Sequence, residues 1–222
     1  MNMSNEVKII GGIGIITLVI VIGAAFLFGG TSSSSSAQNA QPISNTKALV
    51  HKDSHEINAH SKVTLVEFGD FQCPACGAEY PIVTQLLQTY NGKINFVFRN
   101  FPLPQHQNAQ AAAETAEAAG AQGKFFEMYN MLYTNQNTWG ETTNAMDYFT
   151  QYAKALHLDM NKFTSDVKGN KYAAKIQADI NDGYAVNVNA TPTFFLNGVP
   201  IQGGLPYNDF KSRIDQALQS SK

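Results

Sequence analysis

The chain has 222 residues with a formal net charge of −2, and 44% of them are hydrophobic and 14% charged. This length and composition support one domain of ordinary size with additional segments. The small net charge gives no support for a nucleic-acid-binding protein or a basic membrane-surface protein, so we expect no nucleic acid among the partners.

The N-terminal segment has the composition of a membrane anchor. Residues 1–8 are polar, and residues 9–28 contain no charged side chain. An apolar helix of this length spans a hydrocarbon core of about 30 Å. A cleavable signal peptide has a shorter apolar region of about 7–15 residues, closely followed by its cleavage site. We therefore expect an uncleaved transmembrane anchor, with a signal peptide as the alternative.

The charges around this segment predict its orientation. Lys8 precedes the apolar run, and the next basic residue is Lys47. The positive-inside rule then places residues 1–8 in the cytoplasm and the rest of the chain outside. Residues 29–47 are mainly small and polar, which is typical of a flexible linker. We expect a single-pass protein of the cell membrane with an extracytoplasmic domain.

Three of the five histidines lie just after the predicted linker, at His51, His55 and His60, with carboxylates among them. Imidazole and carboxylate groups both bind metals. We favour a solvated lead-in to the domain, with residues 48–50 as a candidate edge strand, over a metal site.

The first strong strand signal covers residues 63–68, which are apolar apart from Thr64 and Glu67. Such a run predicts a central strand that is covered on both faces. A buried carboxylate is costly unless it is paired or its pKa is raised. One interpretation of Glu67 is a proton acceptor that helps Cys76, further along the chain, to deprotonate. The alternative is a solvated side chain at the rim of the sheet.

The two cysteines of the chain, Cys73 and Cys76, follow this strand and precede a helical pattern over residues 77–90. A cysteine at a helix N-terminus is favoured as a thiolate by the free N–H groups and the helix dipole. Pro74 suits the first helical position, where no N–H is needed. We therefore interpret Cys73 as the attacking thiol and Cys76 as the resolving thiol, able to form a disulfide with each other.

Three other interpretations of Cys73 and Cys76 remain open. They could be half of a zinc site, although a structural zinc normally has four ligands and no second cysteine pair is present. They could form a structural disulfide, although such a small loop gives little stabilisation. They could also be two buried free cysteines. We favour the redox pair.

The remaining elements follow in order along the chain. Residues 93–99 alternate and predict a strand, so that strand, helix and strand form a parallel crossover. About 80 residues with helical apolar faces come next. His106, at the entry to this block, is interpreted as structural. Pro192 then opens a strand, Asn197-Gly198 predicts a hairpin turn, and residues 207–218 predict an amphipathic helix.

The segment Phe68–Cys76, with the sequence FGDFQCPAC, resembles the active-site segment of the DsbA-like thiol–disulfide oxidoreductases. Glu67 stands where that superfamily usually carries a buried acid, and Pro81 stands where its helix carries a kinking proline. Thr191-Pro192 matches the family's cis-proline. The resemblance covers roughly residues 48–222.

This resemblance implies an α/β thioredoxin fold with an inserted α-helical subdomain, preceded here by the transmembrane helix. The first part of the fold would comprise residues 48–104, the insertion residues 105–183 and the second part residues 184–222. Catalytic roles are implied for Cys73, Cys76, Glu67 and Pro192. Pro74, Ala75 and Thr191 would line the substrate groove, and a Cys73–Cys76 disulfide would be the redox centre.

The implied activity is that of a dithiol oxidase which introduces disulfides into exported proteins with free thiols. A membrane quinone-linked thiol oxidase would reoxidise it, and no cofactor or metal is expected. The dipeptide Pro74-Ala75 departs from the Pro-His of the best-known member. Because this dipeptide tunes the redox potential in the family, a reductase or isomerase remains an alternative. A non-enzymatic, membrane-tethered binding or chaperone domain with a static disulfide is the other.

Overall fold

The computed structural model describes residues 41–221. The predicted cytoplasmic N-terminus, the anchor at residues 9–28 and the linker as far as residue 40 lie outside the described residues. Within residues 41–221, no helix is long and apolar enough to cross a membrane.

A five-stranded sheet forms the centre of the described part, in the order β1-β3-β2-β4-β5. β2 and β3 are parallel, and the other neighbours are antiparallel. Helix α2, Pro74–Thr89, connects the parallel pair, which confirms the predicted crossover. The strands are β1 His55–Ile57, β2 Val63–Gly69, β3 Ile94–Asn100, β4 Thr193–Leu196 and β5 Val199–Gln202.

The turn between β4 and β5 is the predicted two-residue hairpin. Asn197 and Gly198 have φ angles of 49° and 82°, and positive φ at both central residues is the requirement of a type I′ turn. The expectation of an edge strand at residues 48–50 is wrong. Thr46–Ala48 forms a short 3₁₀ helix, η2, because Ala48 packs on the face of the sheet and not at its edge. The edge strands of the described sheet are β1 and β5.

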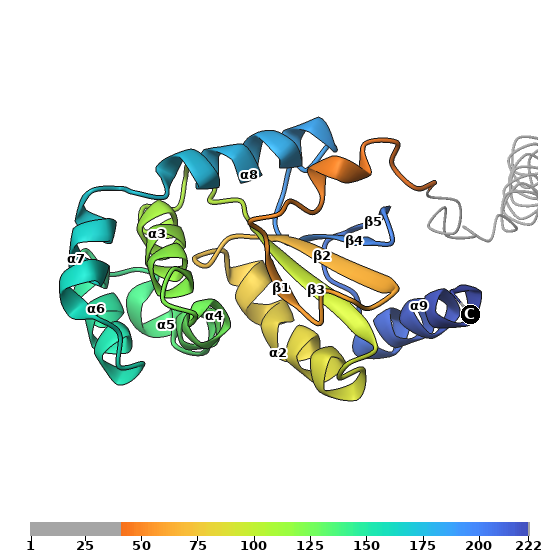
Figure 1. The fold of residues 1–222 in the computed structure, drawn as a ribbon, viewed down its shortest axis with the longest axis horizontal. Helices are drawn as coiled ribbons and strands as arrows, with labels where there is room; N and C mark the ends of the chain where they lie inside the picture. Colours follow the sequence, from red (N-terminus) through yellow and green to blue (C-terminus); the bar gives the residue numbers. More distant parts are fainter. Residues whose placement is uncertain (1–40, 222) are drawn as a thin grey trace, which may run out of the picture. The chain divides into compact units, whose positions relative to one another are not determined.

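The two faces of the sheet are covered by different helices (Figure 1). On the first face, Leu65, Phe96 and Phe98 belong to a hydrophobic cluster with α2 and with α9, Tyr207–Ser220. On the second face, the alternate residues Val66 and Val97 pack with η2 and the segment before β4. Helix α8, Ala173–Ala185, also lies along this second face (Figure 1).

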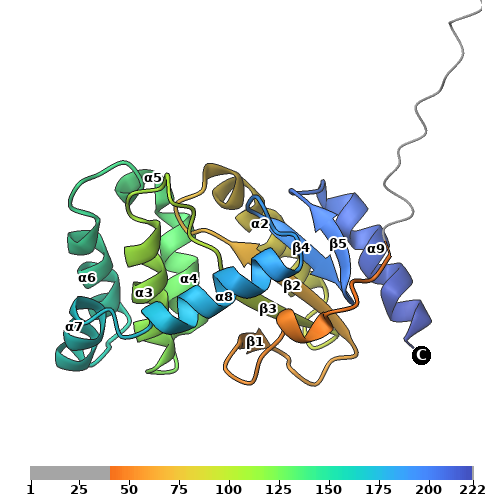
Figure 2. The same cartoon turned by 90° about the horizontal axis from the view of Figure 1, so that it is seen from above.

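The residues between β3 and β4 form the predicted helical insertion, which gathers at one end of the sheet (Figures 1 and 2). Two short helices there, α5 and α7, were not among the elements expected. The expected boundary at residue 183 falls inside α8, which packs against both β3 and α3. The helices before α8 are α3 Ala109–Gly120, α4 Phe125–Thr134, α5 Gln136–Trp139, α6 Ala145–Ala155 and α7 Met160–Lys168.

Candidate active site

The two cysteines lie at the start of α2, as the spacing predicts. Cys73 is the N-cap residue and Pro74 follows at the first helical position. Both cysteines are free thiols, so the geometry is that of the dithiol form. Cys73 is 7% exposed and Cys76 is 1% exposed. An incoming sulfur atom can therefore reach Cys73 more easily than Cys76.

The Cys73 thiol is strongly acidic in this position. Its pKa falls from the ordinary value of 9.0 to about 5, chiefly because the Cys76 thiol donates a hydrogen bond to its sulfur. Burial opposes this effect. The Thr191 hydroxyl and the backbone N–H groups of Cys76 and Ala75 lower the pKa of Cys73 further. Cys73 is consequently a thiolate at neutral pH, which is the nucleophilic form of cysteine.

The Cys76 thiol has the opposite character. Burial raises its pKa well above 9.0, and both its hydrogen bond to Cys73 and the charge of Glu67 act in the same direction. Cys76 therefore keeps its proton at neutral pH. The pair holds one proton and one negative charge, with the charge on the more exposed sulfur.

The predicted proline lies beside this charge. The peptide bond between Thr191 and Pro192 is cis, in agreement with the expectation for this residue. The Thr191 carbonyl oxygen is 3.4 Å from the Cys73 sulfur. Pro74 and Ala75 are exposed, whereas Thr191 and Pro192 are buried. The structure thus brings Cys73 and the cis-proline segment together, although their positions are 118 apart in the chain.

Glu67 is buried on the first face of the sheet, between Phe98 of β3 and Phe194 of β4. It is 2% exposed, so a solvated position at the rim of the sheet is excluded. Burial raises its pKa from 4.5 to about 8. The Tyr129 hydroxyl donates a 3.3 Å hydrogen bond to Glu67 Oε2, which lowers the pKa of Glu67. The charge of Glu79 raises this pKa further.

Side chains of the insertion hold the cysteine loop, and the sequence did not reveal them. The amide of Gln136 in α5 donates to the carbonyl oxygens of Phe71 at 2.7 Å and of Cys73 at 2.9 Å. Gly77 is required for this approach, because a Cβ atom there would overlap the Gln136 side chain. Gln72 donates a further 2.6 Å hydrogen bond to the Gly140 carbonyl.

Asp70 is a second residue that sequence reasoning missed, although it lies within the segment that carries the resemblance. Its buried carboxylate accepts hydrogen bonds from the backbone N–H groups of Gln72 and Leu103, both at 2.8 Å. His106 Nδ1 is 2.7 Å from the same carboxylate. Asp70 and His106 therefore fix the loop before Cys73, which agrees with the structural interpretation of His106.

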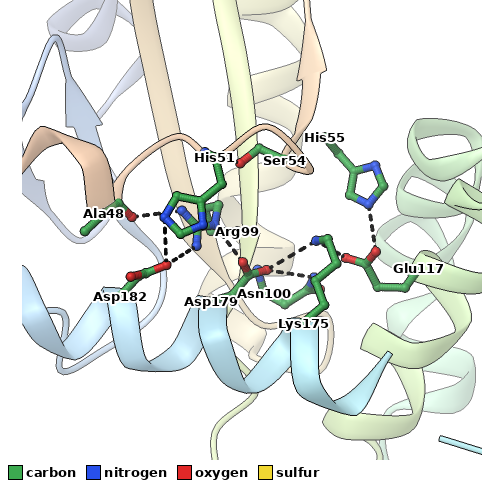
Figure 3. Close-up of polar contacts among 10 residues, drawn as sticks. All are labelled: Ala48, His51, Ser54, His55, Arg99, Asn100, Glu117, Lys175, Asp179 and Asp182. Carbon is green, nitrogen blue, oxygen red and sulfur yellow. Dashed lines mark hydrogen bonds and ion pairs between the residues drawn. The ribbon is translucent and has the colours of Figure 1, made fainter. Parts of the chain in front are cut away.

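Of the lead-in histidines, His51 and His55 point to different acids (Figure 3). His51 lies 3.3 Å from Asp182, and His55 lies 2.9 Å from Glu117, whereas His60 is exposed. Within residues 41–221, no three histidine, cysteine or acidic residues are placed to hold a metal ion. The expectation of a wholly solvated lead-in is wrong for His55, whose ring also stacks on a phenylalanine of α4.

Arg99 lies on the second face of the sheet and shares the carboxylate of Asp182 with His51 (Figure 3). Its guanidinium contacts Asp179 at 2.8 Å and Asp182 at 2.7 Å, and it donates to the Ala48 carbonyl at 2.8 Å. These contacts tie β3, α8 and the lead-in together. They lie on the opposite face of the sheet from Glu67.

Comparison with known proteins matches most of the described chain to one family. A family model described as thioredoxin matches residues 54–216. Among curated proteins, the chain is 42% identical over 161 residues to a protein named Na(+)/H(+) antiporter NhaA 1 of Salinispora arenicola, covering 72% of this chain and 24% of that protein. A similarly named protein of Salinispora tropica is 39% identical and is covered over 21% of its length. The chain thus spans about a quarter of these relatives.

Solved structures share the fold at low sequence identity. Wolbachia pipientis α-DsbA1 superposes with a TM-score of 0.72 at 19% identity, over 81% of this chain and 98% of that chain. Oxidised BdbD of Bacillus subtilis gives a TM-score of 0.68 at 21% identity, over 83% and 100%. A thioredoxin-like oxidoreductase of Silicibacter pomeroyi gives 0.67 at 22% identity, over 80% and 99%.

Proposed function

The chain belongs to the thioredoxin family, and on this basis we propose that it is an extracytoplasmic thiol–disulfide oxidoreductase whose redox centre is the Cys73–Cys76 pair. The observation that carries the proposal is the contrast between the two sulfurs. The pKa of Cys73 is lowered to about 5, and that of Cys76 is raised well above 9.0. A pair of this kind suits exchange, because one sulfur leaves as a stable thiolate and the other holds a proton.

The proposed direction is oxidation of the substrate. A substrate thiolate attacks the Cys73 sulfur of the Cys73–Cys76 disulfide, and the electron pair of the broken bond leaves on Cys76. A second substrate thiolate then attacks the substrate sulfur of the mixed disulfide and releases Cys73. A thiol with a low pKa is a good leaving group, so the acidity of Cys73 favours this second step. The substrate becomes a disulfide and the protein a dithiol.

The surroundings of Cys73 suggest where the substrate binds. Pro74 and Ala75 are exposed next to it, and the backbone of Thr191 approaches its sulfur. An extended substrate segment that pairs with the backbone at Thr191 would bring its own sulfur to Cys73. We propose Pro74, Ala75 and Thr191 as the groove and Pro192 as the residue that shapes it.

The proposal includes a location and partners. Residues 9–28 would anchor the protein by a single pass, with a cytoplasmic N-terminus and the redox domain outside the cell membrane. Exported proteins with free thiols would be the substrates, because disulfides persist on that side. A membrane quinone-linked thiol oxidase would restore the Cys73–Cys76 disulfide. We propose no ion transport, since the antiporter name belongs to proteins of which this chain spans about a quarter.

A reductase or isomerase is the second candidate, and one observation favours it. The pKa of Glu67, about 8, would allow its carboxylate to accept the Cys76 proton when Cys76 attacks a mixed disulfide. The equilibrium reduction potential against glutathione separates the candidates. A potential of about −120 mV supports the oxidase, and one of about −270 mV supports the reductase.

The exchange activity itself is tested with cysteine variants. Cys73→Ser is expected to abolish disulfide exchange with a model peptide. Cys76→Ser is expected to accumulate a mixed disulfide through Cys73, because the resolving thiol is missing. Exchange activity that persists in Cys73→Ser would overturn the proposed function.

A further inference from the structure

Among residues 41–221, Glu67 forms no ion pair, and the groups that shift its pKa besides burial are Tyr129 and Glu79. Its neighbours of β3 and β4 on this face are phenylalanines. Two groups of α2 interact with Glu67. The charge of Glu79 raises the pKa of Glu67, and the charge of Glu67 adds to burial in raising the pKa of Cys76. From α4, Tyr129 and Tyr133 both face Glu67; burial raises the pKa of each phenol, and the charge of Glu67 raises it further. Among these groups, only Tyr129 is hydrogen-bonded to Glu67.

The Tyr129 ring is held in place by aromatic contacts on several sides. Its centroid lies 5.2 Å from that of Phe98 and 5.9 Å from that of Phe71, in edge-to-face arrangements. Tyr133, one turn further along α4, packs against it at 4.9 Å. The ring is buried, so its hydroxyl meets Glu67 without competition from bulk water.

We propose that Tyr129, a residue of the inserted helices, is a positioning residue that controls when Glu67 gains and loses its proton during the exchange chemistry of Cys76. This inference rests on the proposed function for its catalytic meaning. The hydrogen bond itself can be tested separately.

The proton balance of the exchange gives Tyr129 this role. When a substrate thiolate attacks Cys73, the disulfide bond breaks and its electron pair leaves on the Cys76 sulfur. The neutral Glu67 carboxyl donates its proton to that sulfur and becomes a carboxylate, which the Tyr129 hydroxyl stabilises. In the opposite direction, the Glu67 carboxylate takes the proton from Cys76, whose sulfur attacks Cys73 and expels the substrate thiolate.

The hydroxyl has a definite effect on the proton affinity of Glu67. A donor that binds the charged form of a carboxyl lowers its pKa. Tyr129 acts in this direction, against the burial that raises the pKa of Glu67 to about 8. A carboxyl that titrates close to neutral pH can both donate and accept a proton, as a reversible exchange requires. Without the hydroxyl, Glu67 would remain neutral over a wider pH range.

Tyr133 provides a matched control. It lies on the same helix, is also buried, and shares with Tyr129 the contacts to Phe71, Tyr80 and Phe98. Its hydroxyl has no hydrogen-bond partner among the described residues. Tyr133→Phe therefore removes a hydroxyl from the same enclosure without removing a hydrogen bond to Glu67.

The first experiment titrates the Glu67 carboxyl by ¹³C NMR in the full chain, in the dithiol form, with the signal assigned by its loss in Glu67→Gln. Tyr129→Phe is expected to raise the midpoint by about one pH unit, the size of a weak hydrogen bond to a charged group. Tyr133→Phe is expected to leave it unchanged. An unchanged midpoint in Tyr129→Phe, or equal shifts in the two variants, would overturn the inference.

The second experiment follows the chemistry. A mixed disulfide of Cys73 with glutathione is prepared at acid pH, the pH is raised, and glutathione release by Cys76 is timed. At pH 7, Tyr129→Phe is expected to slow the release roughly tenfold, because the ionised fraction of Glu67 falls by that factor. The same substitution in a Glu67→Gln background is expected to have no further effect. An equal slowing in that background would show a role independent of Glu67 and overturn the inference.

These two experiments also separate the inference from the proposed function. If the wild-type protein exchanged no disulfide at all, the oxidoreductase proposal would fail, and with it the role of Tyr129 in the exchange. The NMR titration would still decide whether Tyr129 sets the proton affinity of Glu67.

Discussion

Both faces of the sheet bury carboxylates, but the partners of these carboxylates differ between the two faces. On the second face, Asp179 and Asp182 pair with Arg99, and Glu117 lies 2.7 Å from Lys175 (Figure 3). The ion pairs of these acids join the lead-in, β3, α3 and α8. On the first face, Glu67 has the Tyr129 hydroxyl in place of a cation, and its pKa rises to about 8.

This difference separates a structural role from a chemical one. A buried acid with a well-placed cation keeps its charge, and removal of either partner is costly. A buried acid without a cation is destabilising in its ionised form, yet it can exchange a proton near neutral pH. Glu67, whose charge raises the pKa of the buried Cys76 thiol further, is of the second kind, whereas Asp70 in the loop before Cys73 is held by His106 and by two backbone N–H groups. The acids around Arg99 are therefore suited to holding the fold, and Glu67 is suited to proton transfer.

The largest expected effect comes from removing an ion pair of Arg99 on the second face of the sheet. Asp179→Ala removes the partner of Arg99 Nε and of the Asn100 backbone N–H, so that the buried guanidinium keeps only Asp182 as a counter-charge, and we expect the free energy of unfolding to fall by about 3 kcal/mol. Asp182→Ala is the control. Its side chain is 23% exposed against 6% for Asp179, and we expect a loss of about 1 kcal/mol. Urea unfolding measures both, and equal losses would contradict the importance of burial.

The next prediction concerns the unpaired acid. Between its ordinary pKa of 4.5 and its folded value of about 8, Glu67 is charged in the unfolded chain and neutral in the folded one. It therefore destabilises the fold increasingly as pH rises through this window. Glu67→Gln is expected to raise the free energy of unfolding by about 2 kcal/mol at pH 7. The gain should vanish below pH 4.5, so a gain of the same size at pH 4 would contradict this assignment.

A smaller effect with the opposite pH dependence is expected at Glu117. Burial alone would raise its pKa, but His55 and Lys175 outweigh burial and hold the pKa below 4.5. Its contribution to stability is therefore present above pH 4.5 and is lost as pH falls through the folded pKa. Glu117→Gln is expected to cost about 1–2 kcal/mol at pH 7 and less in acid. Thermal unfolding at several pH values tests this, and a cost that grows toward acid pH would contradict it.

The local parts of the site could be predicted from the sequence. The acidity of Cys73 depends on its place at a helix N-terminus, and Pro74 and the preceding apolar strand reveal that place. The burial of Glu67 follows from its position inside the same strand. The crossover and the hairpin also follow from short segments, because turn residues and strand periodicity are local signals.

The parts contributed by the insertion could not be predicted in this way. Tyr129 reaches Glu67 of β2 across 62 positions of sequence, and Gln136 reaches the Phe71 carbonyl of the cysteine loop across 65. The apolar pattern places Tyr129 in a helix, whereas the short helix α5 that carries Gln136 was not predicted. Which side chain meets Glu67 or the loop carbonyls depends on how the helices pack. The lead-in shows the same limit. Ala48 has the apolar character of a strand residue, yet it packs on the sheet face and accepts a hydrogen bond from Arg99.

The difference between the two cysteines is tested most directly by the pH dependence of alkylation in the dithiol form, with each sulfur followed by mass spectrometry. We expect the rate at Cys73 to rise with a midpoint near pH 5, while Cys76 stays unreactive until well above pH 9. Cys76→Ala should move the Cys73 midpoint upward, because it removes the main hydrogen-bond donor to that sulfur. A Cys73 midpoint near pH 9, or equal rates at both sulfurs, would contradict the proposed redox chemistry.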